Sequence, residues 1–122
     1  MLGIGIDAVD IERFRASLER TPTMRTRLFT DGELSDLADR ADMVPSLAAR
    51  FAVREATMKA LGVGIGAFGF HDVWVESADD RRPPTLHVTG RAKELADAAG
   101  ITGWHVSITH TTTVAMAVVA AH

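Results

Sequence analysis

The N-terminal residues predict a strand followed by a helix. The stretch LGIGIDAV is a short apolar run that predicts a strand ending at Asp7. In the next stretch, DIERFRASLER, the apolar residues Ile11, Phe14 and Leu18 recur at helical spacing with polar residues between them. A proline at position 22 is expected to end this helix.

Two more helices are predicted before the middle of the chain. Thr30 stands three residues before Glu33, which is the pattern of a capping box at a helix start. This second helix is expected to run through Leu37 and to fray near residue 42. Pro45 then opens a third helix, from about residue 47 to residue 61.

The second half of the chain predicts two pairs of strands separated by a helix. A glycine-rich segment, residues 62–69, is expected to be a loop, and the sequence ADDRRPP is expected to be a turn. Strands are predicted on either side of that turn, then a helix closed by Gly100, then two strands joined by a turn at Thr111-Thr112. The order strand, three helices, two strands, helix, two strands predicts an α+β fold with a mostly antiparallel sheet.

Composition narrows the class of protein. The chain has 122 residues, of which 47% are apolar and 24% charged, so we expect one globular domain over residues 1–122. No apolar run approaches the ~20 residues that span a bilayer. The absence of cysteine excludes disulfides and thiolate metal sites, and a cytoplasmic protein is expected. A net charge of −3 argues against a general nucleic-acid-binding protein.

The third predicted helix carries charges among apolar residues. Arg50 and Arg54 form one pair at i,i+4 spacing, and Glu55 and Lys59 form another. Apolar stripes on either side predict a helix packed on two faces, with the charges in the seams. One interpretation is a simple Glu55–Lys59 ion pair. The other is a phosphate site, because cations neutralise phosphate oxygens while a carboxylate holds a hard metal ion.

Two further side chains are candidates for the same site. Asp7 follows a buried strand, and a second carboxylate beside Glu55 would suit Mg²⁺; a turn-forming aspartate is the alternative. His110 stands at the tip of the strand WHVSITH, on its more apolar face. The five histidines are scattered, so a zinc site is poorly supported, and a structural role for His110 stays open.

Five arginines lie close together near the N-terminus, against Glu19 alone. This local basic charge on an acidic protein indicates either an acidic partner or a solvated helix face. The arginines are Arg13, Arg15, Arg20, Arg25 and Arg27.

Three motifs in this order resemble the holo-[acyl-carrier-protein] synthase family of 4′-phosphopantetheinyl transferases. They are GIGIDAVDIERF, RFAVREATMKALGVGIG and HVSITHT, with RLFTDGEL also similar to a family segment. The likeness covers nearly the whole chain. It implies the family's α+β fold and transfer of phosphopantetheine from coenzyme A to a serine of an apo acyl carrier protein, with adenosine 3′,5′-bisphosphate as the leaving group.

The resemblance also implies roles for individual residues. Asp7 and Glu55 match Mg²⁺ ligands and, together with Lys59, the catalytic set. Lys59 matches the lysine that contacts coenzyme A phosphates. Other matching positions line the coenzyme A site, and the helix with Arg13 and Arg20 matches the surface that docks the carrier. Family members are usually homotrimers with sites shared between subunits. The coenzyme A positions are Arg50, Arg54, Lys59, Gly62, Thr109 and His110.

One departure from the family pattern concerns Arg54, which stands where the family has lysine. Arginine keeps the charge but cannot act as a proton-transferring base near neutral pH. A non-catalytic module that binds coenzyme A or a carrier therefore stays open as an alternative, as does a purely structural oligomer. The identity of the base, Glu55 or a metal-bound water, and the identity of the carrier also stay open.

Overall fold

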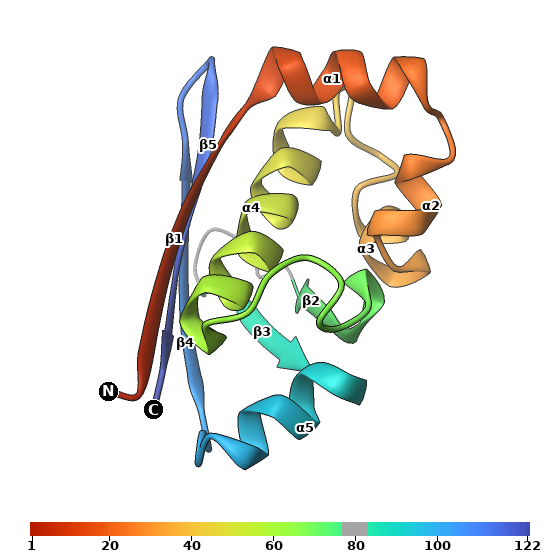
Figure 1. Cartoon of the computed structure of the whole chain (residues 1–122). Coiled ribbons are helices and arrows are strands. Elements are labelled where there is room, and N and C mark those ends of the chain that lie inside the picture. The colour runs from red at the N-terminus through yellow and green to blue at the C-terminus, as the bar shows by residue number, and fades with distance from the viewer. Residues whose placement is uncertain (77–82) are drawn as a thin grey trace.

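The computed structural model describes residues 1–76 and 83–122, and its elements form the expected α+β fold (Figure 1). The α+β prediction is confirmed. In chain order the elements are β1 (Gly3–Asp10), α1 (Ile11–Arg20), α2 (Met24–Leu28), α3 (Asp31–Asp36), α4 (Val44–Leu61), the 3₁₀ helix η1 (Phe70–Asp72), β2 (Val73–Glu76), β3 (Thr85–Val88), α5 (Gly90–Ala98), β4 (Trp104–His110) and β5 (Val114–Ala121).

The strands form two antiparallel sheets. The larger sheet has the order β1-β5-β4, so the first strand pairs with the last. The strands β2 and β3 form a separate two-stranded sheet. The long helix α4 runs along one face of the larger sheet, while α1 crosses one end of that helix (Figure 1). Asp7 of β1 lies opposite Ala117 of β5, and both side chains point toward α4.

Small residues let β1 approach the backbone of α4. A Cβ atom on Gly5 would collide with the carbonyl oxygen of Ala56, and one on Gly3 would collide with that of Ala60. Ala52 and Ala56 on this face of the helix are fully buried. This direct backbone contact places Asp7, two residues beyond Gly5 on the same strand face, against the middle of α4.

Several elements differ from the prediction. Strand β1 continues past Asp7, its predicted end, to Asp10. The chain has four helices before β2, not three, because the arginine-rich segment forms the five-residue α2. Helix α4 starts at Val44, three residues before the expected start, with Pro45 in its first turn. The capping box of Thr30 and Glu33 is confirmed, as is the packing of α4 on two sides. The predicted turn ADDRRPP falls mainly on residues 77–82, outside the described residues.

The opposite face of the larger sheet carries exposed apolar side chains. Ile4 is 59% exposed and Ile6 is 56% exposed, and Val118 of β5 lies beside Ile6. In Figure 1 no helix lies over this face of the described chain. Among the described residues, no helix combines the length and the apolarity needed to span a membrane.

Candidate active site

Asp7, Glu55 and Lys59 come together where β1 meets α4. The ammonium of Lys59 lies 3.1 Å from Asp7 Oδ1 and donates a 2.9 Å hydrogen bond to the carbonyl oxygen of Ile6. Lys59 thus pairs with the strand, and no Glu55–Lys59 ion pair forms among the described residues. The Asp7 side chain is 18% exposed and that of Lys59 is 54% exposed, so the cation remains open to a ligand.

Burial and two neighbouring charges affect the pKa of the Glu55 carboxyl group. Partial burial raises its pKa above the ordinary value, the negative charge of Asp7 raises it further, and Lys59 opposes both effects. The two carboxylates are therefore close enough to repel each other. A divalent cation between them would relieve this repulsion, so the donor set fits a hard metal ion such as Mg²⁺. Within the described ranges no cluster of three or more metal-ligating side chains occurs, and further ligands would have to be water or substrate oxygens.

A hollow of about 310 Å³ opens beside these carboxylates, between β1, α1 and α4. Its floor is aromatic, because Phe14 and Phe51 both line it. The centres of their rings lie 5.3 Å apart. The lining residues are Asp7, Ala8, Val9, Asp10, Arg13, Phe14, Ser17, Phe51 and Glu55.

The start of α1 fixes the basic rim of this hollow. The Asp10 side chain accepts a 2.9 Å hydrogen bond from the backbone N–H of Arg13 and so caps the helix. Arg13 and Ser17 then lie one turn apart on the side of α1 that borders the hollow. Carboxylates, an aromatic floor and a cationic rim therefore share one depression.

The two arginines of α4 lie away from this hollow. Arg54 has no exposed surface and Arg50 has 4%, and both guanidinium groups point toward α3. Arg50 donates to the backbone carbonyl of Glu33, and burial lowers its pKa. The expectation that Arg54 binds coenzyme A disagrees with this position, because its guanidinium is enclosed in the interior. The same burial argues against Arg50 as a ligand within one chain.

The remaining candidate residues are distributed over two places. Gly62 ends α4 in the left-handed conformation with φ 71°, one turn beyond Lys59. His110 and Thr109 lie on β4, which is separated from β1 by β5. Two strand spacings put β4 about 10 Å from β1, and neither residue lines the Asp7–Glu55 hollow of the same chain.

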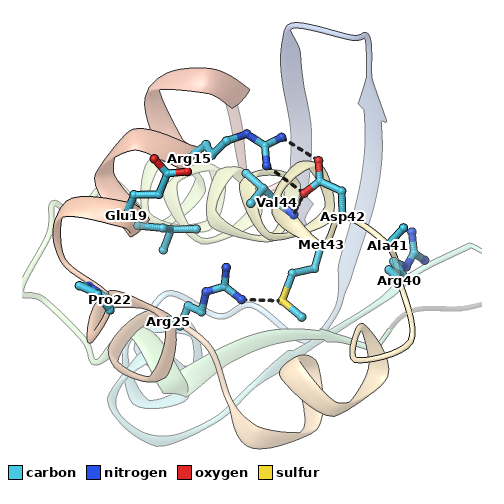
Figure 2. Close-up of a pocket in the computed structure, with 10 residues that line it drawn as sticks. Arg15, Glu19, Pro22, Arg25, Arg40, Ala41, Asp42, Met43 and Val44 are labelled. Carbon is cyan, nitrogen blue, oxygen red and sulfur yellow. Dashed lines mark hydrogen bonds and ion pairs between the residues drawn. The ribbon is translucent and has the colours of Figure 1, made fainter.

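A second hollow, of about 390 Å³, lies on the other side of α1 (Figure 2). Arg15 and Asp42 form a two-armed ion pair across it, at 2.7 and 3.0 Å. The ion pair raises the pKa of Arg15 and lowers the pKa of Asp42, which favours the charged form of both. Arg25 contacts the sulfur of Met43 at 3.1 Å. This hollow is lined by further charged residues, but it lacks the Asp7–Glu55 pair that could hold a metal ion.

The chain matches the family model described as the 4′-phosphopantetheinyl transferase superfamily over residues 3–119. It is also 49% identical to the holo-[acyl-carrier-protein] synthase of Micrococcus luteus, over 99% of this chain and 91% of that protein. A second synthase, from Streptomyces avermitilis, is 47% identical over 99% of this chain and 97% of the relative. The chain belongs to the 4′-phosphopantetheinyl transferase superfamily. The resemblance found in its motifs is thereby confirmed.

Solved structures of the superfamily share the fold. The Helicobacter pylori holo-[acyl-carrier-protein] synthase in complex with coenzyme A is 31% identical, with a TM-score of 0.82 over 98% of this chain and 99% of that chain. The Neisseria meningitidis synthase is 27% identical, with a TM-score of 0.88 over 100% of this chain and 98% of the other. The expected synthase fold is therefore confirmed.

Several residues that shape this candidate site are not predicted by the motifs in the sequence. Glu33 was assigned only a capping role, although its carboxylate also binds Arg54 inside the protein. The signal for such an acid is the pair Arg50 and Arg54 among the apolar residues of the helix, because buried charges need a partner. Phe51 and Ser17 line the hollow without belonging to any motif of charged residues. Their position depends on how α1 crosses α4, which local sequence patterns do not predict.

Proposed function

We propose that this chain transfers the 4′-phosphopantetheine group from coenzyme A to a serine of an apo acyl carrier protein. The observation that carries the proposal is that Asp7 and Glu55 line one hollow beside Arg13 of α1, with the accessible Lys59 paired to Asp7. It is supported by the synthases to which the chain is similar, one of which was solved in complex with coenzyme A. The whole chain, residues 1–122, is proposed to act as one domain.

In this proposal each charged residue of the site has its own role in the reaction. Asp7 and Glu55 hold Mg²⁺, which when bound neutralises charge on the pyrophosphate oxygens. The ammonium of Lys59 binds a phosphate oxygen, because about half of its side chain is exposed and it is paired with Asp7, which lines the hollow. Glu55 is also the candidate base, since burial and the charge of Asp7 raise its pKa.

The bonds formed and broken balance without any further reactant. The carrier's serine oxygen forms a bond to the phosphorus next to the pantetheine arm, and the serine proton passes to a base. The bond from that phosphorus to the bridging pyrophosphate oxygen breaks. The bridging oxygen leaves with adenosine 3′,5′-bisphosphate, whose developing negative charge Lys59 stabilises.

The proposal extends to partners. The carrier is acidic in the family, and we place its docking surface on the α1 face with Arg13 and Arg20. The exposed apolar sheet face around Ile6 is proposed to bind two further copies of the chain, giving a homotrimer. His110 and Thr109 would then reach a neighbouring copy's site. A role in fatty-acid synthesis and a cytoplasmic location are parts of the same proposal.

A mass measurement tests the reaction. The protein is incubated with coenzyme A, Mg²⁺ and apo acyl carrier protein, and the carrier is then weighed. A gain of one phosphopantetheine that is absent with EDTA is the expected result. Binding of coenzyme A without any gain, tried with fatty-acid, polyketide and multidomain-synthase carriers, would favour the non-catalytic binding module instead.

A further inference from the structure

Arg54 of α4 is fully buried and uses its whole guanidinium group. Two of its nitrogens bind the Glu33 carboxylate, Nη1 to Oε2 at 2.9 Å and Nη2 to Oε1 at 2.5 Å. The third, Nε, donates to the backbone carbonyl of Phe70 at 2.7 Å. Neither side chain of the ion pair is more than 1% exposed. A buried pair of this kind needs every polar group satisfied, and no buried side-chain nitrogen or oxygen among the described residues lacks a partner.

These contacts join two separate segments, α3 and η1, to the helix that carries Glu55. Glu33 belongs to α3, where its carboxylate also accepts from the backbone N–H of Thr30. Phe70 begins η1, directly after the glycine-rich segment 62–69. Because Gly62 ends α4 itself, Arg54 holds one end of that segment and α4 the other. The guanidinium group therefore fixes where the glycine-rich segment returns to the body of the protein.

A second route leads from Arg54 to the floor of the candidate active site. Its guanidinium carbon lies 5.2 Å from the centre of the Phe29 ring. That ring packs edge-on against Phe14 at 6.2 Å, and Phe14 packs against Phe51 at 5.3 Å. Phe14 and Phe51 line the hollow beside Glu55. The interior of the protein thus connects the buried ion pair to the site by direct packing.

Arginine suits this position for a geometric reason. Its planar fork presents two parallel N–H groups to one carboxylate while Nε points elsewhere, here to Phe70. A lysine has one nitrogen at the end of a flexible chain and cannot bind both acceptors with the same geometry. Arg54, which stands where the family has lysine, therefore lies in the interior and not in the hollow. No proton transfer is required at this position.

We propose that Arg54 is a positioning residue: by binding Glu33 and Phe70 it sets the placement of Glu55 and of the glycine-rich segment relative to the hollow. This inference rests on the proposed transferase function. It predicts that the ion pair matters for the placement of the site as well as for stability. The two effects can be separated, because removing both members of a buried pair leaves no unpaired charge.

The test uses the double variant Glu33→Gln with Arg54→Met. Glutamine retains the capping pattern with Thr30, and methionine fills much of the space of the arginine. The matched control is Glu94→Gln with Arg91→Met, which removes an exposed ion pair on α5. Arg54→Lys is the conservative variant. Each protein is measured by thermal melting, by hydrogen exchange of amides 62–69 without ligand or metal, and by separate kcat and KM values for coenzyme A.

The double variant is expected to melt cooperatively, to exchange amides 62–69 faster than the control, and to lose kcat roughly ten- to hundredfold. Arg54→Lys is expected to recover part of that loss. A folded double variant with wild-type exchange, kcat and KM would overturn the inference. If the double variant does not fold, wild-type kinetics in Arg54→Lys would overturn it equally. A wild-type protein that transfers nothing would contradict the proposed function instead.

Discussion

Lys59 crosses from α4 to β1 and places its ammonium group 3.1 Å from Asp7 Oδ1. The same nitrogen donates to the carbonyl of the preceding residue, Ile6. The ammonium group thus lies against β1. Glu55 lies one helical turn before Lys59, and the negative charge of Asp7 raises its pKa. The opposed influences of Asp7 and Lys59 on Glu55 give the first prediction.

The pKa of Glu55 in the metal-free protein is expected to respond in opposite directions to its two neighbours. Asp7→Asn removes a negative charge that disfavours ionised Glu55, so its pKa falls and the proton is lost at lower pH. Lys59→Met removes a favourable positive charge, so the pKa rises. Carbon-13 NMR of labelled glutamate measures both shifts. Asp39→Asn, an exposed control, should leave the titration unchanged, and identical curves in all variants would contradict this account.

Loss of either carboxylate is expected to abolish Mg²⁺-dependent transfer while leaving the fold intact. Asp7→Asn and Glu55→Gln should each lower kcat by about two orders of magnitude or more, because each removes charge aimed at the metal. Circular dichroism and mass measurement of the carrier separate folding from turnover. Full activity in either variant would exclude that residue as a metal ligand, and Asp39→Asn again serves as the control.

Charge reversal at Arg13 is expected to weaken carrier recognition. Arg13→Glu replaces attraction to an acidic partner by repulsion, so KM for the carrier rises and its dependence on salt becomes smaller or changes sign. Arg40→Glu is the matched control, since it changes net charge equally but lies at the second hollow, across α1 (Figure 2). Equal effects of both variants on KM and on salt dependence would mean that overall charge matters and the α1 surface does not.

The sequence predicts those parts of the fold and site that depend on local patterns. Periodicity located β1, α1 and the last two strands, and the Thr30–Glu33 spacing predicted the start of α3. Asp7, Glu55 and Lys59 meet as their motifs suggested. The five-residue helix α2 escaped prediction because so short a helix shows no periodicity of its own.

Contacts between distant segments could not be predicted in the same way. The spacing of Arg50 and Arg54 gave no sign of which side of α4 would be covered by α3, because that depends on how the chain turns between residues 37 and 43. The spacing alone therefore predicts that both arginines face a ligand, although Glu33 holds Arg54 in the interior. His110 and Thr109 stay apart from Asp7 in one chain because β5 inserts between their strands.

The close approach of β1 to α4 makes Gly5 a sensitive position. Gly5→Ala is expected to destabilise the protein by about 1–3 kcal/mol, because the new methyl group meets the backbone oxygen of Ala56 and the strand must move. Asp7 moves with the strand, so kcat should fall as well. Gly64→Ala is the control, since nothing lies within 4 Å of its added Cβ. Denaturant unfolding measures the difference, and equal stability of the two variants would contradict the packing argument.

The exposed sheet face is expected to be the surface on which copies of the chain associate. Ile6→Glu places a charge at the centre of that face, where Ile4 and Val118 also lie, so burial in an interface becomes costly. Analytical ultracentrifugation should then show monomer where the wild type sediments as a trimer. Ala41→Glu adds the same charge at an exposed position in the segment between α3 and α4 and should remain trimeric. If the monomeric variant also loses transfer but keeps its fold, the site needs a neighbouring copy; a monomeric wild type would refute the trimer.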